Sequence, residues 1–181
     1  MKKVNSLMVI LIITGSISGF SLKKERHKNP QQFIITFPVL SNSDYVPSLV
    51  PVEKDKITRL SSGFGQRIHP ITNKKQFHRG VDIAAPKGAE VYATAKGEVI
   101  SVKTDLGGYG KHIKIRHGKQ YVTHYAQLSD FKVKTGDLVV KGQLIGHVGS
   151  SGASTAPHLH YEIIKDGKHV DPENYFEYRS K

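Results

Sequence analysis

Cysteine is absent from this chain of 181 residues, and acidic residues are few relative to basic ones. Without cysteine there is neither a disulfide framework nor a thiolate metal site, so any transition-metal site has to use His, Asp or Glu. A total of 27 Lys and Arg against 15 Asp and Glu gives a formal net charge of +12, spread along the chain. Such a protein attracts polyanions, among them nucleic acid, membrane surfaces and anionic envelope polymers.

The N-terminus has the features of a secretory signal. "MKK" precedes the 14-residue apolar run "LMVILIITGSISGF", Leu7 to Phe20, with small residues around Ser16 and Ser18. This pattern predicts a signal peptide or membrane anchor in residues 1–20, and no cysteine follows that would indicate a lipoprotein. We therefore expect export to the periplasm or cell envelope, with N-terminal membrane association and no nucleic acid as partner.

The rest of the chain divides into a linker and one domain. Residues 21–56 mix charges, "SNSD" and prolines without a sustained period, which is typical of an extended linker or a pro-region. From Ile57 to the C-terminus, strand-like segments recur between glycines: "AEVYATA", "GEVISVKT", "KHIKIRHG", "KQYVTHYA", "QLIGHVGS" and "HLHYEIIKDGK". In "KHIKIRH", Ile113 and Ile115 fall on one face, and no segment shows a helical period. We predict an all-β domain of antiparallel strands over residues 57–181.

Two separate stretches carry residues that suit a metal site. In "FHRGVDIAAPKG", a β conformation would put His78, Gly80 and Asp82 on one face, with Gly80 leaving room between the two side chains. In "HLH", His158 and His160 also share a face. His78, Asp82 and His160 then give three N/O ligands around an open position, the layout of a catalytic zinc site, with His158 free to handle protons. Either pattern alone is common by chance, but both together in a cysteine-free exported β domain indicate zinc.

From about residue 57 to 176 the chain resembles the lysostaphin/LytM-type zinc endopeptidases, which cut peptidoglycan cross-bridges or stem peptides. The motifs that carry the resemblance, in the family's order and spacing, are "SSGFGQRIHPIT", "FHRGVDIAAPKGAEVYATAKGEVI", "GGYGKHIKIRHG", "VKTGDLVVKGQLIGHVGSSGASTAPHLHYEI" and "VDPENYF". The resemblance implies a compact antiparallel β fold, related to barrel-sandwich hybrids, with a substrate groove holding one zinc ion. It assigns metal binding to His78, Asp82 and His160 and the general base to His158, in a monomer acting on peptidoglycan.

The chain departs from that family where an oxyanion donor is expected. The family has a histidine in a "Y-x-H-L" motif, whereas the matching stretch here is "YVTHYAQLSDF", which aligns Gln127 with that histidine. The Gln127 amide keeps an N–H donor that can stabilise an oxyanion. His124 is the alternative, although its odd offset along the strand predicts that it points to the other face. We assign the catalytic role to Gln127 and keep His124 as its rival.

Two other functions are compatible with parts of the sequence. A catalytically weak or inactive domain could bind the wall or activate a hydrolase, but such domains usually lose metal ligands, and all three are present here. "VKTGDLVVKGQLIGHVG" looks like the hairpin of biotinyl and lipoyl carrier domains, yet the modified lysine turn is missing. Family-like position indicates that Arg67 and Tyr109 contact substrate, while His117, His147 and His169 are predicted to face solvent.

Overall fold

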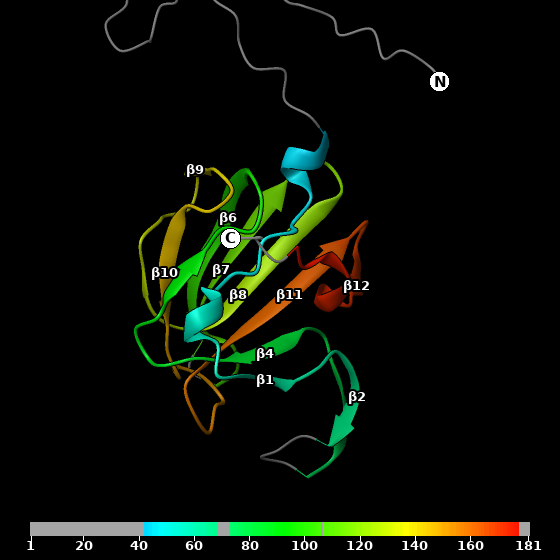
Figure 1. The fold of residues 1–181 in the computed structure, drawn as a ribbon, viewed down its shortest axis with the longest axis vertical. Coiled ribbons are helices and arrows are strands. Elements are labelled where there is room, and N and C mark those ends of the chain that lie inside the picture. Colours follow the sequence, from blue (N-terminus) through cyan, green and yellow to red (C-terminus); the bar gives the residue numbers. More distant parts are fainter. Residues whose placement is uncertain (1–41, 69–72, 106, 178–181) are drawn as a thin grey trace, which may run out of the picture. The chain divides into compact units, whose positions relative to one another are not determined.

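Short β-strands make up nearly all the regular structure, as the alternating segments predict (Figure 1). The computed structural model describes residues 42–68, 73–105 and 107–177. They fall in one unit, Asn42–Lys181, and the predicted signal of residues 1–20 lies outside the described residues. Within the described ranges no helix has the length and apolar character needed to cross a membrane.

The described strands form a large antiparallel sheet and a separate two-stranded pair. In chain order they are β1 (Arg59–Ser62), β2 (Gly65–Ile68), β3 (Lys75–His78), β4 (Val81–Ala84), β5 (Glu90–Tyr92), β6 (Gly97–Asp105), β7 (Gly110–His117), β8 (Tyr121–Phe131), β9 (Leu138–Val139), β10 (Leu144–Val148), β11 (His158–Lys165) and β12 (Lys168–Val170). The large sheet has the order β1-β4-β11-β8-β7-β6-β9; β12 joins β11, and β10 joins β8 and β5. β2 pairs with β3, and the described residues also contain the 3-10 helices η1 (Asn42–Tyr45), η2 (Lys54–Lys56) and η3 (Pro172–Tyr175). The predicted all-β fold of antiparallel strands is confirmed.

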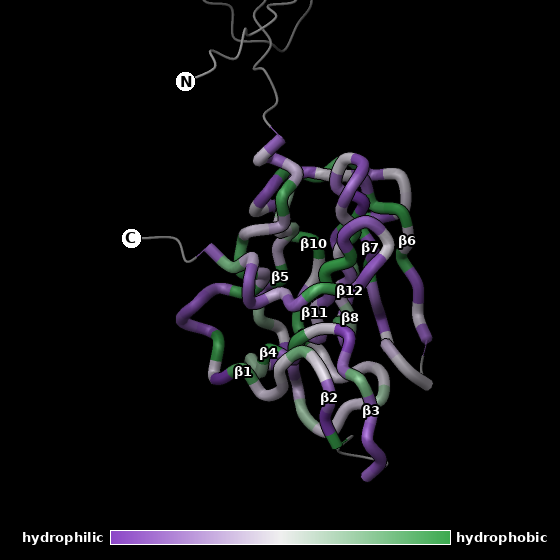
Figure 2. Tube along the Cα trace, turned by 90° about the vertical axis from the view of Figure 1, so that its right-hand side faces the viewer, coloured by the Kyte–Doolittle hydropathy of each residue, from purple (hydrophilic) through white to green (hydrophobic). Residues whose placement is uncertain are grey.

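The hydrophobic core lies on one face of the large sheet because apolar residues alternate along its strands. On β7, Ile113 and Ile115 are fully buried while Arg116 is exposed, as the two-residue period predicts. Tyr125 of β8 and Tyr161 of β11 belong to the same core, with ring centroids 5.2 Å apart. β3, which belongs to the separate two-stranded pair, is largely hydrophilic, in contrast to the strands that form the core (Figure 2). The opposite face of β8 and β11 carries polar side chains, and the candidate site lies there.

His117 is buried, so the prediction that it faces solvent is wrong. Its side chain is 0% exposed, with Nδ1 2.8 Å from the Lys96 carbonyl and Nε2 2.7 Å from Thr123 Oγ1. The backbone at Gly97 covers the ring so closely that a Cβ there would lie 2.7 Å from Nδ1. Burial lowers the pKa of His117 to about 4, so the imidazole is neutral at pH 7.

Residues 42–56, named here the N-terminal strap, are part of the folded unit (Figure 1). The sequence predicts an extended linker, and the strap is indeed extended between η1 and η2, but it packs against the domain. Leu49 and Val52 are 9% and 2% exposed, and Val52 belongs to the core. The strap bridges to β5 at Val91 and to the C-terminal segment at Glu177. The compact folded unit therefore includes the strap and begins at Asn42.

Candidate metal centre and active site

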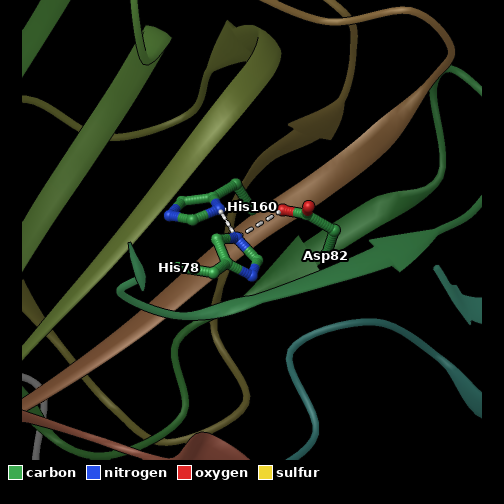
Figure 3. Close-up of side chains that lie close together, drawn as sticks. All are labelled: His78, Asp82 and His160. Carbon is green, nitrogen blue, oxygen red and sulfur yellow. Dashed lines mark hydrogen bonds and ion pairs between the residues drawn. The ribbon is translucent and has the colours of Figure 1, made fainter. Parts of the chain in front are cut away.

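The pairing of β4 with β11 brings two of the predicted ligands together. Asp82 of β4 and His160 of β11 are direct cross-strand partners, so their side chains leave the sheet on the same face. His160 Nδ1 lies 2.8 Å from Asp82 Oδ1 (Figure 3). Both side chains are largely buried, which shields the pair from bulk water.

His78 reaches the same point from outside the large sheet. It is the last residue of β3, and the chain turns at Arg79 and Gly80 before β4 begins. His78 Nε2 lies 3.1 Å from His160 Nδ1 (Figure 3) and 3.2 Å from Asp82 Oδ1. The interpretation of residues 78–82 as one strand is therefore wrong, although the two side chains do converge.

Gly80 has a different role from the one its spacing predicts. A Cβ on Gly80 would lie 2.2 Å from the Tyr161 carbonyl oxygen and 2.9 Å from Glu162 Cγ. The missing side chain thus makes room for the backbone of β11 and leaves no space for an ion. Any larger residue would push the turn off β11 and move His78 away from its partners.

The three side chains fit a zinc ion in the chemistry and spacing of their donor atoms. His78 Nε2, Asp82 Oδ1 and His160 Nδ1 lie 2.8–3.2 Å from one another. N and O ligands about 2.0–2.1 Å from a tetrahedral zinc ion are about 3.3 Å apart. Among the described residues this is the one group of three His, Asp or Glu side chains whose ligand atoms converge in this way. Two imidazoles and one carboxylate are a ligand set that suits zinc.

Outer hydrogen bonds orient the first two ligands. His78 Nδ1 donates to the Gly63 carbonyl oxygen at 2.7 Å, which leaves the lone pair of Nε2 facing the other ligands. Arg67 Nη1 donates to Asp82 Oδ2 at 2.9 Å and leaves Oδ1 for an ion. Burial alone would raise the pKa of Asp82, but its interactions with the neighbouring His160 and His78 hold it well below its usual value.

His160 has its outer partner in Glu162, a residue that the sequence analysis did not single out. His160 Nε2 lies 3.0 Å from Glu162 Oε1, on the side of the ring opposite to Asp82. Burial opposes a charge on His160, but hydrogen bonds with Asp82 and Glu162 raise its pKa to about 9. A metal ion must therefore displace a proton from this ring. The two-residue spacing of "HYE" on a strand predicts only that Glu162 shares a face with His160, and it does not predict their hydrogen bond.

His158 lies beside the three ligands with one nitrogen directed toward them. Its Nδ1 is 2.8 Å from the Ala156 carbonyl oxygen, so this nitrogen carries the proton as donor. Its Nε2 lies 3.8 Å from Asp82 Oδ1 and is left with a lone pair. The side chain is 17% exposed, so it contacts both the site and solvent. This arrangement suits a general base.

Gln127 lies at a β-bulge and ties two loops together. The register of β8 shifts near this residue, and its φ of 64° is in the left-handed region. The Gly152 N–H donates to Gln127 Oε1 at 2.7 Å, and Gln127 Nε2 donates to the Gly108 carbonyl at 3.2 Å. These bonds use one of the two amide N–H groups of Nε2 and fix the direction of the other.

His124 lies on the same face as Glu162, its cross-strand partner, so the expectation that it points away from the site is wrong. The bulge at Gln127 adds a residue and breaks the simple alternation on which that expectation rests. His124 Nδ1 lies 3.4 Å from Glu162 Oε2, and its buried Nε2 has no hydrogen-bond partner among the described residues. Burial lowers the pKa of His124 to about 4. A neutral ring that donates from Nδ1 has only a lone pair on Nε2, which makes it a poor oxyanion donor.

The sequence of this domain matches a known family over its central part. Residues 76–172, more than half of the chain, match the family described as Peptidase family M23. The chain belongs to peptidase family M23. DD-carboxypeptidase/endopeptidase Mpg of Neisseria meningitidis is 50% identical to this M23 domain over 115 residues, 64% of the chain and 26% of the relative. Peptidoglycan DD-endopeptidase ShyC of Vibrio cholerae is 41% identical over 116 residues, 63% of the chain and 26% of the relative. The chain thus spans about a quarter of the length of these relatives.

Solved structures show the same fold as this M23 domain. A zinc containing peptidase from Vibrio cholerae has a TM-score of 0.64 and 39% identity, over 69% of this chain and 38% of that chain. The catalytic domain of lysostaphin from Staphylococcus simulans has a TM-score of 0.59 and 31% identity, over 65% of this chain and 90% of that chain. These similarities confirm the lysostaphin-like fold and the family that the sequence motifs indicated.

Arg67 and Tyr109 of the M23 domain, which family-like position placed in contact with substrate, hydrogen-bond to side chains of the candidate site. Arg67 holds Asp82, as described above, and it also lines an open hollow of about 640 Å³ with Gln66, Ile68 and Lys75. Tyr109 donates its hydroxyl to Glu162 Oε1 at 2.8 Å, and its ring centroid lies 5.6 Å from that of His160. Arg67 therefore holds a candidate metal ligand directly, and Tyr109 holds the carboxylate that hydrogen-bonds to His160.

Proposed function

We propose that this M23 domain is a zinc-dependent endopeptidase that hydrolyses peptide bonds in peptidoglycan cross-links or stem peptides during remodelling of the cell wall. The observation that carries the proposal is the convergence of His78 Nε2, Asp82 Oδ1 and His160 Nδ1, with the lone pair of His158 Nε2 beside them. When bound, zinc acts as a Lewis acid that polarises a carbonyl and makes water more acidic.

In this proposal His158 carries the protons. Its Nδ1–H is fixed on the Ala156 carbonyl, so Nε2 accepts the proton of the attacking water and passes it to the leaving amine. The developing oxyanion needs a donor, and the second N–H of the Gln127 amide is our candidate because His124 presents an acceptor. Arg67 keeps Asp82 in place, and it also lines an open hollow on the β2–β3 pair.

Peptidoglycan as substrate is supported by the names of the relatives, which are DD-endopeptidases, and by the excess of positive charge. The same anionic attraction would keep the domain close to the envelope. Export rests on the signal pattern of residues 1–20.

The first prediction concerns the metal. Purified protein is expected to hold about one zinc ion per chain, and Ala at His78, Asp82 or His160 is expected to lower occupancy because each removes one of three ligands. Zinc should also raise the melting temperature, since it joins segments that are far apart in sequence. Elemental analysis and thermal melts with and without chelator measure both. His147→Ala, on β10, is the matched control; stoichiometric zinc in His160→Ala would show that the ligand set is wrong.

The test of the activity is digestion of purified sacculi followed by mass spectrometry of the released muropeptides. The zinc-loaded protein is expected to release products that lack one peptide bond, and His160→Ala is expected to release none. The masses of the products identify the bond. Zinc binding without any product would exclude the enzyme and leave a domain that binds the wall or a partner.

The second prediction concerns Gln127. If its free N–H stabilises the oxyanion, Gln127→Ala lowers kcat by roughly 10²–10³, while His124→Ala has little effect on kcat. Gln127→His is expected to keep or raise activity. If Gln127 only ties the two loops, Gln127→Ala lowers the melting temperature and leaves kcat within about a factor of ten. Rates of product release from sacculi, together with thermal melts, separate these outcomes.

A collapse of turnover in His124→Ala with a mild effect of Gln127→Ala would reverse the assignment. No hydrolysis by wild type, with activity only in Gln127→His, would mean that this chain has lost catalysis and kept the metal.

A further inference from the structure

Glu162 is a buried carboxylate at the centre of the polar face of β11 and β8. Its side chain is 2% exposed, and a carboxylate in such a position is unfavourable unless hydrogen bonds compensate for the lost water. The structure supplies four donors. Tyr109 Oη and His160 Nε2 meet Oε1 at 2.8 and 3.0 Å, and His169 Nε2 and His124 Nδ1 meet Oε2 at 3.1 and 3.4 Å.

The two oxygens of this carboxylate therefore serve different partners. Oε1 accepts from His160, whose other nitrogen, Nδ1, is the one that lies near Asp82 and His78. A proton held on Nε2 leaves the lone pair on Nδ1, which is the form that a metal requires. Oε2 accepts from residues that are not metal ligands.

We infer that Glu162 is a positioning residue for the metal centre: it fixes the ring and the tautomer of His160 so that Nδ1 binds the ion. The inference rests on the proposed metal site and goes beyond it in assigning a role to a residue outside the ligand set. Outer carboxylates of this kind typically change metal affinity by about 10–100-fold when removed. Tyr109 assists by donating a hydrogen bond to the same oxygen.

The experiment measures zinc affinity of the purified full chain by competition with a fluorescent chelator at pH 7. Glu162→Leu, which removes the acceptor, is expected to raise the Kd for zinc by about 10–100-fold. Glu162→Gln keeps an oxygen that accepts from His160 Nε2, so it is expected to recover most of the affinity. His169→Gln, which alters one of the two partners of Oε2 and none of Oε1, is the matched control and is expected to leave the Kd within about threefold.

If Glu162 had a merely structural role, its variants would have a lower melting temperature and an unchanged Kd for zinc. Equal zinc affinities of wild type, Glu162→Leu and Glu162→Gln would therefore overturn the inference. Should Glu162→Leu fail to fold, nitrogen NMR of wild-type His160 decides: Nε2 protonated and Nδ1 bound to zinc is expected, and the reverse overturns it. Wild type that binds no zinc overturns the proposed function itself, whereas zinc-binding wild type with indifferent Glu162 variants overturns this inference alone.

Discussion

A protein with His158→Ala is expected to bind zinc normally and to lose most of its turnover. The side chain of His158 lies outside the three converging donors, with Nε2 3.8 Å from Asp82 Oδ1, so occupancy should stay near that of wild type. Removing a positioned general base lowers kcat by roughly 10²–10⁴. Release of muropeptides from sacculi at equal zinc content measures the effect.

The control for this prediction is His147→Ala. His147 is also a half-buried histidine, but it lies on β10 and pairs with Asp130 at 2.7 Å, away from the metal ligands. Its variant is expected to keep activity. If His158→Ala retained more than a tenth of wild-type kcat, another group would have to be the base; if it lost zinc, His158 would have to be counted among the ligands.

Removing the N-terminal strap is expected to destabilise the domain severely. A chain that begins at Ile57 lacks Leu49 and Val52, and burial of each such side chain contributes about 1.5–3 kcal/mol. The loss of about 3–6 kcal/mol is comparable with the total stability of many domains, about 5–15 kcal/mol. Urea melts of chains that begin at residues 42 and 57 measure the difference.

A point substitution in the complete chain tests the same packing. Val52→Ala is expected to lower the free energy of unfolding by about 2 kcal/mol. Val140→Ala removes the same atoms from a side chain that is 61% exposed and should stay within about 0.5 kcal/mol of wild type. If instead the chain from residue 57 were as stable as the chain from residue 42 and more active, the strap would be a removable pro-region that covers the groove.

Local spacing was enough to predict the strands, and it singled out His78, Asp82, His158 and His160 as candidate site residues. The two-residue period of β7 and β11 fixes which side chains share a face, so the assignment of Ile113 to the core and of His160 to the polar face follows from the sequence. The pairing of β4 with β11 does not follow from any local pattern. The resemblance to a family supplied that link.

The residues that hold the side chains of the site in place were harder to predict because their contacts join parts of the chain that are distant in sequence. Arg67 holds Asp82 from a separate pair of strands, and Glu162 is recognisable as a partner of His160 only once the ring orientation is known. The bulge at Gln127 reversed the expected face of His124. The strap lacks a period because it pairs through isolated bridges, so its sequence is typical of a linker although Val52 is buried.

The pairing of β4 with β11 also determines when, during folding, the three candidate ligands come together. Asp82 and His160 are 78 positions apart, and His78 and His160 are 82 apart, so the ligands stay distant until β11 lies between β4 and β8. Contacts between such remote segments form late, because a long loop has to close first. A chain in which β11 has not yet been synthesised or folded therefore holds the candidate ligands apart. The proposed hydrolytic activity can therefore begin only once β11 has been synthesised and has folded between β4 and β8.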